Sequence, residues 1–151
     1  MHRILVFAFR GNISSAVAKS IKTECDKLFL DSSTTAIDDF VTSESLKDYD
    51  YILGLGVYSR RDRGEIRIER VCSSSFRSKS IAVDSMQIPY FMHPAAEIKL
   101  ASGIGNSWCN LVSFRLTNEA KVNRYSFLHV PKTFSVDLAA QIIDQQLKLL
   151  A

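Results

Sequence analysis

Short, unbroken runs of apolar residues constrain the fold of this chain more than any other feature. Two such runs cover residues 4–9 and 51–56, and residues 125–130 form a third segment of strand-forming residues that includes Ser126 and His129. Runs of this length and composition typically form strands that are buried on both faces of a sheet. Such a sheet needs helices on each side, so the intervening segments should show the apolar spacing of helices.

The segments between these predicted strands carry apolar residues at helical spacing. After the first run, Asn12 or Ser14 can serve as the N-cap of a helix. Apolar side chains then recur every three or four positions, at Ile13, Val17, Ile21, Cys25 and Leu28. A weak second helix is expected around Ser45, a strong one from near Ser107 and a final one capped by Ser135. Strands that alternate with helices predict a three-layer α/β/α sandwich with a mostly parallel sheet.

Weaker segments complete the expected sheet. Residues 66–71 alternate between apolar and polar side chains, which predicts an edge strand or a half-buried strand. Residues 81–83 and 98–101 are two further strand candidates, and Pro131 should stop the strand at 125–130. Because there is no internal repeat, linker or low-complexity segment, we expect residues 1–151 to form a single domain.

Composition and charge exclude several classes of protein. The chain is 46% hydrophobic and only 23% charged, which excludes intrinsic disorder, and its net charge of +3 is far below that of a dedicated nucleic-acid binder. Residues 60–70 hold five arginines, but three acidic residues lie among them without an aromatic platform, which favours a solvated loop. We therefore expect no nucleic acid as a partner.

The cysteines and the apolar runs bear on localisation. An odd number of widely spaced cysteines (Cys25, Cys72 and Cys109) argues against a disulfide framework and agrees with a reducing compartment. No apolar run approaches the ~18 residues that cross a bilayer, and the first residues do not resemble a secretory signal. We therefore expect a cytoplasmic protein without a membrane partner. No metal site is expected, since the His and Cys residues lack the spacing of metal ligands.

Cys109 is the first candidate for chemistry. It follows the glycine-bearing turn at 103–107, where a strand ends and a helix begins. The positive end of a helix favours thiolate, the form that attacks carbonyl carbons, and its free N–H groups can bind an oxyanion. The alternative is an ordinary buried cysteine.

His129 and Glu69 are the other candidates. His129 lies near the carboxyl end of an expected central strand, where ligand crevices form in α/β sheets, although it could equally be a satisfied core histidine. Glu69 lies among apolar residues, and its plainer interpretation is an exposed carboxylate paired with a neighbouring arginine. Together with Cys109 they could supply a nucleophile, a base and a residue that orients the base, but spacing alone does not bring them together.

Three segments resemble the pyroglutamyl peptidase type I (pyrrolidone carboxyl peptidase) family. Residues 66–71 match its Ile-x-x-Glu-Arg-Val block, 105–110 match in part its Ser-Ala-Gly-x-x-x-Cys-Asn block, and 127–131 match in full its Phe-Ile/Leu-His-Val-Pro block. The three blocks also occur in the family's order. The chain resembles a shortened and divergent member, and the resemblance implies that Cys109 is the nucleophile, His129 the base and Glu69 the orienting carboxylate.

The resemblance also implies residues that bind substrate. In the family's glycine-rich N-terminal loop, this chain keeps Phe9 and Asn12 but lacks the second Phe and the Glu. The family has an arginine upstream of its Glu. Spacing to the Glu favours Arg63 for that role, whereas spacing from the preceding Gly-Leu pair favours an earlier residue, Arg60 or Arg61.

Two functions are therefore expected from different classes. The first is a cysteine hydrolase of the thiol-peptidase type that cleaves an N-terminal pyroglutamyl or related amide from a small peptide, without a cofactor. The second is a catalytically degenerate relative that binds a small ligand or a protein partner. The intact Cys-His-Glu set favours the first and the altered N-terminal loop favours the second. The resemblance further suggests self-association into a homo-oligomer.

Overall fold

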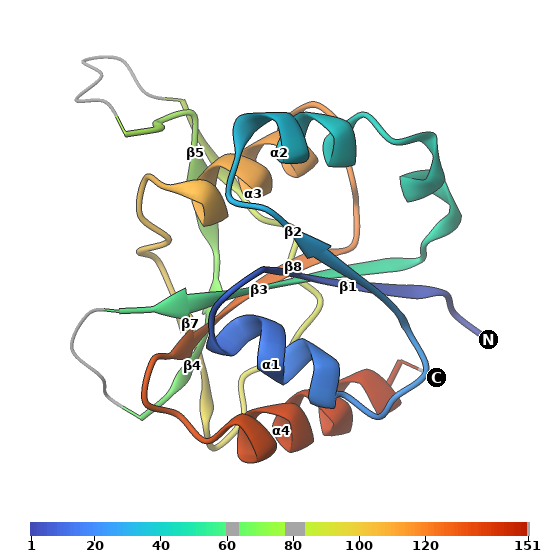
Figure 1. The fold of residues 1–151 in the computed structure, drawn as a ribbon, viewed down its shortest axis with the longest axis vertical. Coiled ribbons are helices and arrows are strands. Elements are labelled where there is room, and N and C mark those ends of the chain that lie inside the picture. The colour runs from blue at the N-terminus through green and yellow to red at the C-terminus, as the bar shows by residue number, and fades with distance from the viewer. Residues whose placement is uncertain (60–63, 78–83, 151) are drawn as a thin grey trace.

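A six-stranded sheet forms the centre of the protein in a computed structural model, which describes residues 1–59, 64–77 and 84–150 (Figure 1). The strand order is β2-β1-β3-β8-β4-β7, and every neighbouring pair is parallel except β4 and β8. The strands are β1 (Ile4–Phe9), β2 (Asp26–Leu30), β3 (Tyr51–Tyr58), β4 (Ile66–Glu69), β7 (Ile98–Ala101) and β8 (Tyr125–Pro131). The predicted mostly parallel sheet is confirmed.

Helices cover both faces of this sheet (Figure 1). One face carries α1 (Ile13–Ser20) and α4 (Val136–Lys148), which pack on one another, and the other carries α2 (Thr34–Val41) and α3 (Trp108–Asn118). A 3-10 helix, η1 (Glu44–Asp48), follows α2, and a separate antiparallel pair is formed by β5 (Val71–Ser73) and β6 (Ser85–Gln87). The three-layer α/β/α arrangement is therefore also confirmed.

The two faces of the sheet bury different side chains. The α1 and α4 face is mainly aliphatic, with Leu128 and Val130 of β8 among the buried residues. The α2 and α3 face is richer in aromatic rings, including Phe7, Phe40 and Phe127. Successive residues of a strand point to opposite faces, so His129 shares the α3 face with Phe127. This alternation decides which side of the sheet can hold a site.

The first helix is shorter than its sequence predicts. It ends at Ser20 rather than near Leu28, and the segment after it forms the edge strand β2. The reason is a long-range contact, because the Asp144 carboxylate of α4 accepts hydrogen bonds from the backbone N–H groups of Lys22 and Thr23, at 3.0 and 2.8 Å. These bonds hold the chain away from the helical path. Cys25 therefore lies outside the helix and only partly buried against the core.

Other segments also differ from the predictions. Helix α2 was not expected, and the helix expected around Ser45 is the short 3-10 helix η1. The expected strand at 66–71 is divided at Arg70 between two sheets, and its first part, β4, lies between β8 and β7 rather than at an edge. The strand expected at 81–83 lies outside the described residues.

Candidate active site

A cavity of about 330 Å³ opens where β1, β3 and β8 end and α3 begins. In parallel sheets this carboxyl edge is where ligands are usually bound. Each of the three strands contributes lining residues, and the turn before α3 lines another side of the cavity. The lining residues are Phe9, Asn12, Ser32, Gly56, Val57, Tyr58, Ser59, Gly103, Ile104, Gly105, Asn106, Ser107, Trp108, Cys109 and His129.

The side chains of Glu69 and His129 form a hydrogen bond next to this cavity, which His129 lines. The Glu69 Oε1 atom lies 2.9 Å from the His129 Nδ1 atom, and the two residues are 0% and 4% exposed. The antiparallel pairing of β4 with β8 explains the contact: Arg67 lies opposite His129, and Glu69 follows two positions later on the same face. Glu69 is therefore not the exposed carboxylate that its sequence context allowed.

Glu69 has further partners that favour its charged form. Its Oε2 atom accepts a hydrogen bond from the Gly103 N–H at 3.1 Å, and the Arg67 Nε atom lies 3.3 Å from Oε1. Burial alone would raise the pKa of this carboxyl group. The hydrogen bond and charge of His129, the charge of Arg67 and the Gly103 N–H outweigh burial, so the pKa of Glu69 is lowered.

The thiol of Cys109 lies over β3. Cys109 is the second residue of α3, and a Cβ atom placed on Gly56 would lie only 2.7 Å from the Cys109 Sγ atom. Gly56 pairs with His129 in the ladder between β3 and β8, and neighbouring strands lie about 5 Å apart. The structure thus brings the thiol over the strand position beside His129, in the cavity that both residues line.

The charge state of the thiol differs from the prediction. Burial raises the pKa of Cys109 to about 12, and the nearby Glu69 carboxylate adds to this rise, while the backbone N–H of Cys109 offsets only part of it. The expected shift toward thiolate at the start of α3 is therefore wrong, because desolvation outweighs the helix terminus. At neutral pH the resting thiol keeps its proton.

The expected substrate-binding residues have different outcomes. Phe9 and Asn12 both line the cavity. Asn12 is also the N-cap of α1, and its side-chain oxygen accepts a hydrogen bond from the Ser14 N–H at 2.9 Å. The arginine expected near the site, Arg63 or alternatively Arg60 or Arg61, lies outside the described residues.

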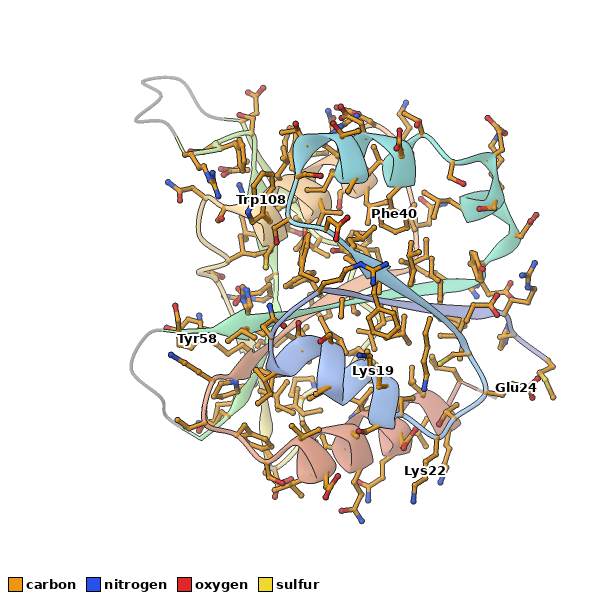
Figure 2. The ribbon with its side chains drawn as sticks, viewed as in Figure 1. Lys19, Lys22, Glu24, Phe40, Tyr58 and Trp108 are labelled. Atoms are coloured by element: carbon orange, nitrogen blue, oxygen red, sulfur yellow. The ribbon has the colours of Figure 1, made fainter. Side chains whose placement is uncertain are left out.

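Two residues beside the site were not predicted. Tyr58 lines the cavity with its ring centroid 6.0 Å from that of His129, and the Arg67 guanidinium lies 4.4 Å from the centroid of the Tyr58 ring. Figure 2 shows Tyr58 where β3 ends. The alternation in residues 66–69 could have placed Arg67 on the same face as Glu69. The sequence held no signal that Tyr58 would lie beneath Arg67.

Buried Asn110 fixes the start of α3 to β5. Its Oδ1 atom accepts a hydrogen bond from the Ser73 N–H at 2.8 Å, and its Nδ2 atom donates to the carbonyl oxygens of Ser73 and Ser75 at 3.0 and 2.7 Å. Two residues before Asn110, the ring of Trp108 packs against Phe76 with centroids 4.9 Å apart. These contacts hold the helix turn that carries Cys109.

A cluster of metal ligands and a membrane-spanning helix are both absent from the part of the chain that the structure describes. No three His, Cys, Asp or Glu side chains among those residues are grouped so that they could hold a metal ion. Within the same described ranges, no helix is long and apolar enough to cross a membrane.

Solved structures with a similar fold are pyroglutamyl peptidases. The pyrrolidone carboxyl peptidase from Thermus thermophilus superposes with a TM-score of 0.77 at 14% identity, over 96% of this chain and 98% of that one. The chain shares its fold with pyroglutamyl peptidases. The pyrrolidone carboxyl peptidase from Fervidobacterium islandicum gives a TM-score of 0.79 at 16% identity, over 99% and 98% of the two chains.

A third pyroglutamyl peptidase structure agrees with the first two. Pyroglutamyl peptidase I from Bacillus amyloliquefaciens gives a TM-score of 0.72 at 12% identity, over 95% of this chain and 94% of that one. No family model and no curated protein sequence matches the chain. The likeness to pyroglutamyl peptidases is therefore one of fold.

Proposed function

We propose that this protein is a cysteine peptidase that cleaves an N-terminal pyroglutamyl or related amide, with Cys109 as nucleophile, His129 as base and Glu69 as the orienting carboxylate. One observation carries the proposal: a buried Glu69–His129 hydrogen bond lies beside a thiol that approaches Gly56, on the strand next to His129. A carboxylate, an imidazole and a thiol in this order form the set used for nucleophilic acyl transfer.

The Glu69 bond assigns the roles of the two imidazole nitrogens. With Nδ1 bonded to Glu69, the Nε2 atom is the one to take a proton from the Cys109 thiol. Sγ then attacks the amide carbonyl carbon, and the imidazolium returns the proton to the leaving amine as the C–N bond breaks. Water, deprotonated by His129, attacks the resulting thioester, releases the acid and restores the thiol.

The raised pKa of Cys109 favours proton transfer during the attack rather than before it. A thiol with a pKa of about 12 holds very little thiolate at neutral pH, so the imidazole has to accept the proton as the S–C bond forms. The charge that develops on the carbonyl oxygen can be stabilised by backbone N–H groups in the first turn of α3. Ser107, the N-cap of this helix, makes no side-chain capping bond to them.

The cavity and the fold support the substrate class. The three solved structures described above are pyroglutamyl peptidases. The cavity, of about 330 Å³ and lined by Phe9, is large enough for one small residue of a peptide substrate. Because the N-terminal loop lacks the second Phe of the resembling family, we expect weak recognition of the pyroglutamyl ring and slow turnover.

Hydrolysis of a fluorogenic L-pyroglutamyl amide tests the proposal. We expect slow turnover that falls by about a thousandfold or more in Cys109→Ala and in His129→Ala, because both remove a group that takes part in bond formation. Cys25→Ala is the matched control, since Cys25 lies outside the cavity. Full activity in Cys109→Ala would exclude the nucleophile. Saturable binding of pyroglutamyl peptides without any turnover would instead indicate the degenerate binding protein.

A further inference from the structure

A cation accompanies the buried carboxylate of Glu69. Glu69 receives three contacts: His129 Nδ1 at 2.9 Å and Arg67 Nε at 3.3 Å on Oε1, and the Gly103 N–H at 3.1 Å on Oε2. Its side chain is 0% exposed. Among the residues that the structure describes, Arg67 is the Lys or Arg that forms an ion pair with Glu69.

Arg67 is itself held in place. It lies opposite His129 in the β4 and β8 ladder, and its guanidinium stacks over the ring of Tyr58 at 4.4 Å from the centroid. On another side, a Cβ atom on Gly103 would lie 3.0 Å from its Nη2 atom. Its side chain is 24% exposed, so little freedom is left to the guanidinium. A cation fixed in this way can fix the group that it binds.

We infer that Arg67 is a positioning residue that keeps Glu69 ionised and directed at His129 throughout the reaction; this inference rests on the proposed function. An ionised carboxylate buried without a partner is strongly disfavoured. His129 supplies a positive charge only while its imidazole is protonated, whereas the Arg67 guanidinium is always charged. Whenever the imidazole is neutral, the positive charge beside Glu69 comes from Arg67.

Among the residues that the structure describes, other ionisable groups around Glu69 do not replace Arg67. Cys109 approaches from α3, and its thiol is neutral at rest. Tyr58 approaches from β3 beneath the guanidinium. Two further cations lie on or beside the neighbouring strands but bind other partners: Lys99 of β7 pairs with Glu65, and Arg70 donates to the Ser102 hydroxyl. Within the described ranges, the positive charges that contact Glu69 are therefore those of Arg67 and of protonated His129.

The first test compares Arg67→Gln, Arg67→Lys and the matched control Arg70→Gln. The 13C chemical shift of the Glu69 carboxyl group is followed by NMR against pH, which requires no enzymatic activity. Removal of the cation makes protonation of Glu69 easier, so its titration moves to higher pH in Arg67→Gln. Arg67→Lys keeps the charge and moves less, and Arg70→Gln titrates as the unchanged protein does. An unchanged titration in Arg67→Gln, with lower thermal stability, would overturn the inference.

The second test follows hydrolysis of the pyroglutamyl amide. In Arg67→Gln, kcat falls by about tenfold or more while KM changes little, and the acidic limb of the pH–rate profile moves to higher pH. Equal profiles for Arg67→Gln and Arg70→Gln would contradict a positioning role. If Arg67→Gln does not fold, Tyr58→Leu frees the guanidinium from its stack and must move the Glu69 titration in the same direction. Absence of turnover in the unchanged protein would refute the proposed function, while the NMR titration would still test Arg67.

Discussion

Glu69 and His129 lie 60 positions apart in the chain, and a hydrogen bond of 2.9 Å joins their side chains in the interior. The bond depends on the antiparallel pairing of β4 with β8, because this pairing sets Arg67 opposite His129 and turns Glu69 to the same face. Changes to either residue should therefore affect both the site and the sheet that carries it.

The first prediction separates orientation from proton transfer. Glu69→Gln keeps the size of the side chain but cannot stabilise an imidazolium, so we expect hydrolysis to fall but remain measurable. In the double variant Glu69→Gln with His129→Ala, activity should be close to that of His129→Ala alone, because residues that act as one unit are not additive. Steady-state kinetics on one amide substrate, with folding checked by circular dichroism, provides the measurement. Losses that simply multiply would show that Glu69 acts independently of His129.

The second prediction concerns the close approach of Gly56 to Cys109. Gly56→Ala places a methyl group 2.7 Å from Sγ and 2.8 Å from the Phe127 Cζ atom, so the thiol or the ring must move. We expect a loss of about 1–3 kcal/mol in stability and at least about tenfold in kcat/KM. Gly54→Ala is the control, because its methyl group would press on Phe127 and Phe7 but not on the thiol. Equal kinetic losses in the two variants would attribute the effect to the core rather than to the thiol.

The third prediction follows from the pKa of Cys109, which is raised to about 12. Iodoacetamide should label Cys109 slowly at neutral pH, with a rate that rises as the pH exceeds 9, as mapped by mass spectrometry of each cysteine peptide. Glu69→Gln removes a negative charge that raises this pKa, so labelling of Cys109 should become faster even though hydrolysis becomes slower. A labelling rate that is already at a plateau near pH 6 would show a thiolate–imidazolium pair and contradict the prediction.

The fourth prediction concerns Asn110. Asn110→Ala removes the buried amide that bonds to the Ser73 N–H and to the carbonyl oxygens of Ser73 and Ser75, and each such hydrogen bond contributes about 0.5–1.5 kcal/mol. We expect a clear fall in the free energy of unfolding, measured by urea denaturation, and a smaller loss of activity. Asn118→Ala, at the exposed last position of the same helix, should change stability by less than about 1 kcal/mol. Similar stabilities of the two variants would show that Asn110 does not anchor α3.

Local pattern predicted the parts of the fold in which periodicity and burial agree. The predicted strands at 4–9, 51–56 and 125–130 are β1, most of β3 and most of β8, and the caps near Ser107 and Ser135 begin α3 and α4. Helical spacing failed after Ser20, because Cys25 and Leu28 fit the period while the Asp144 carboxylate, far along the chain, draws the backbone out of the helix. Local sequence around Cys25 and Leu28 cannot show this contact, because Asp144 lies more than a hundred residues further along the chain.

The candidate site was predicted by residue type and by resemblance, whereas its electrostatics were not. Spacing did not show that β4 runs antiparallel to β8, which is what joins Glu69 to His129. The helix terminus alone suggested a thiolate at Cys109, but desolvation depends on how closely Sγ packs against Gly56. The contact of Arg67 with Tyr58 arises from two strands separated in the sheet by β8, which sequence periodicity cannot relate.

The antiparallel pairing of β4 also selects its own register while the chain folds. A slip of one residue against β8 would turn Arg67 and Glu69 toward the aliphatic layer beneath α1 and α4, and would send Ile66 and Ile68 out to the cavity. Two charges among aliphatic side chains would cost several kcal/mol, so the misaligned sheet is strongly disfavoured. The Arg67–Glu69 pair beside the imidazole therefore also favours the correct register of β4 during folding, independently of any substrate.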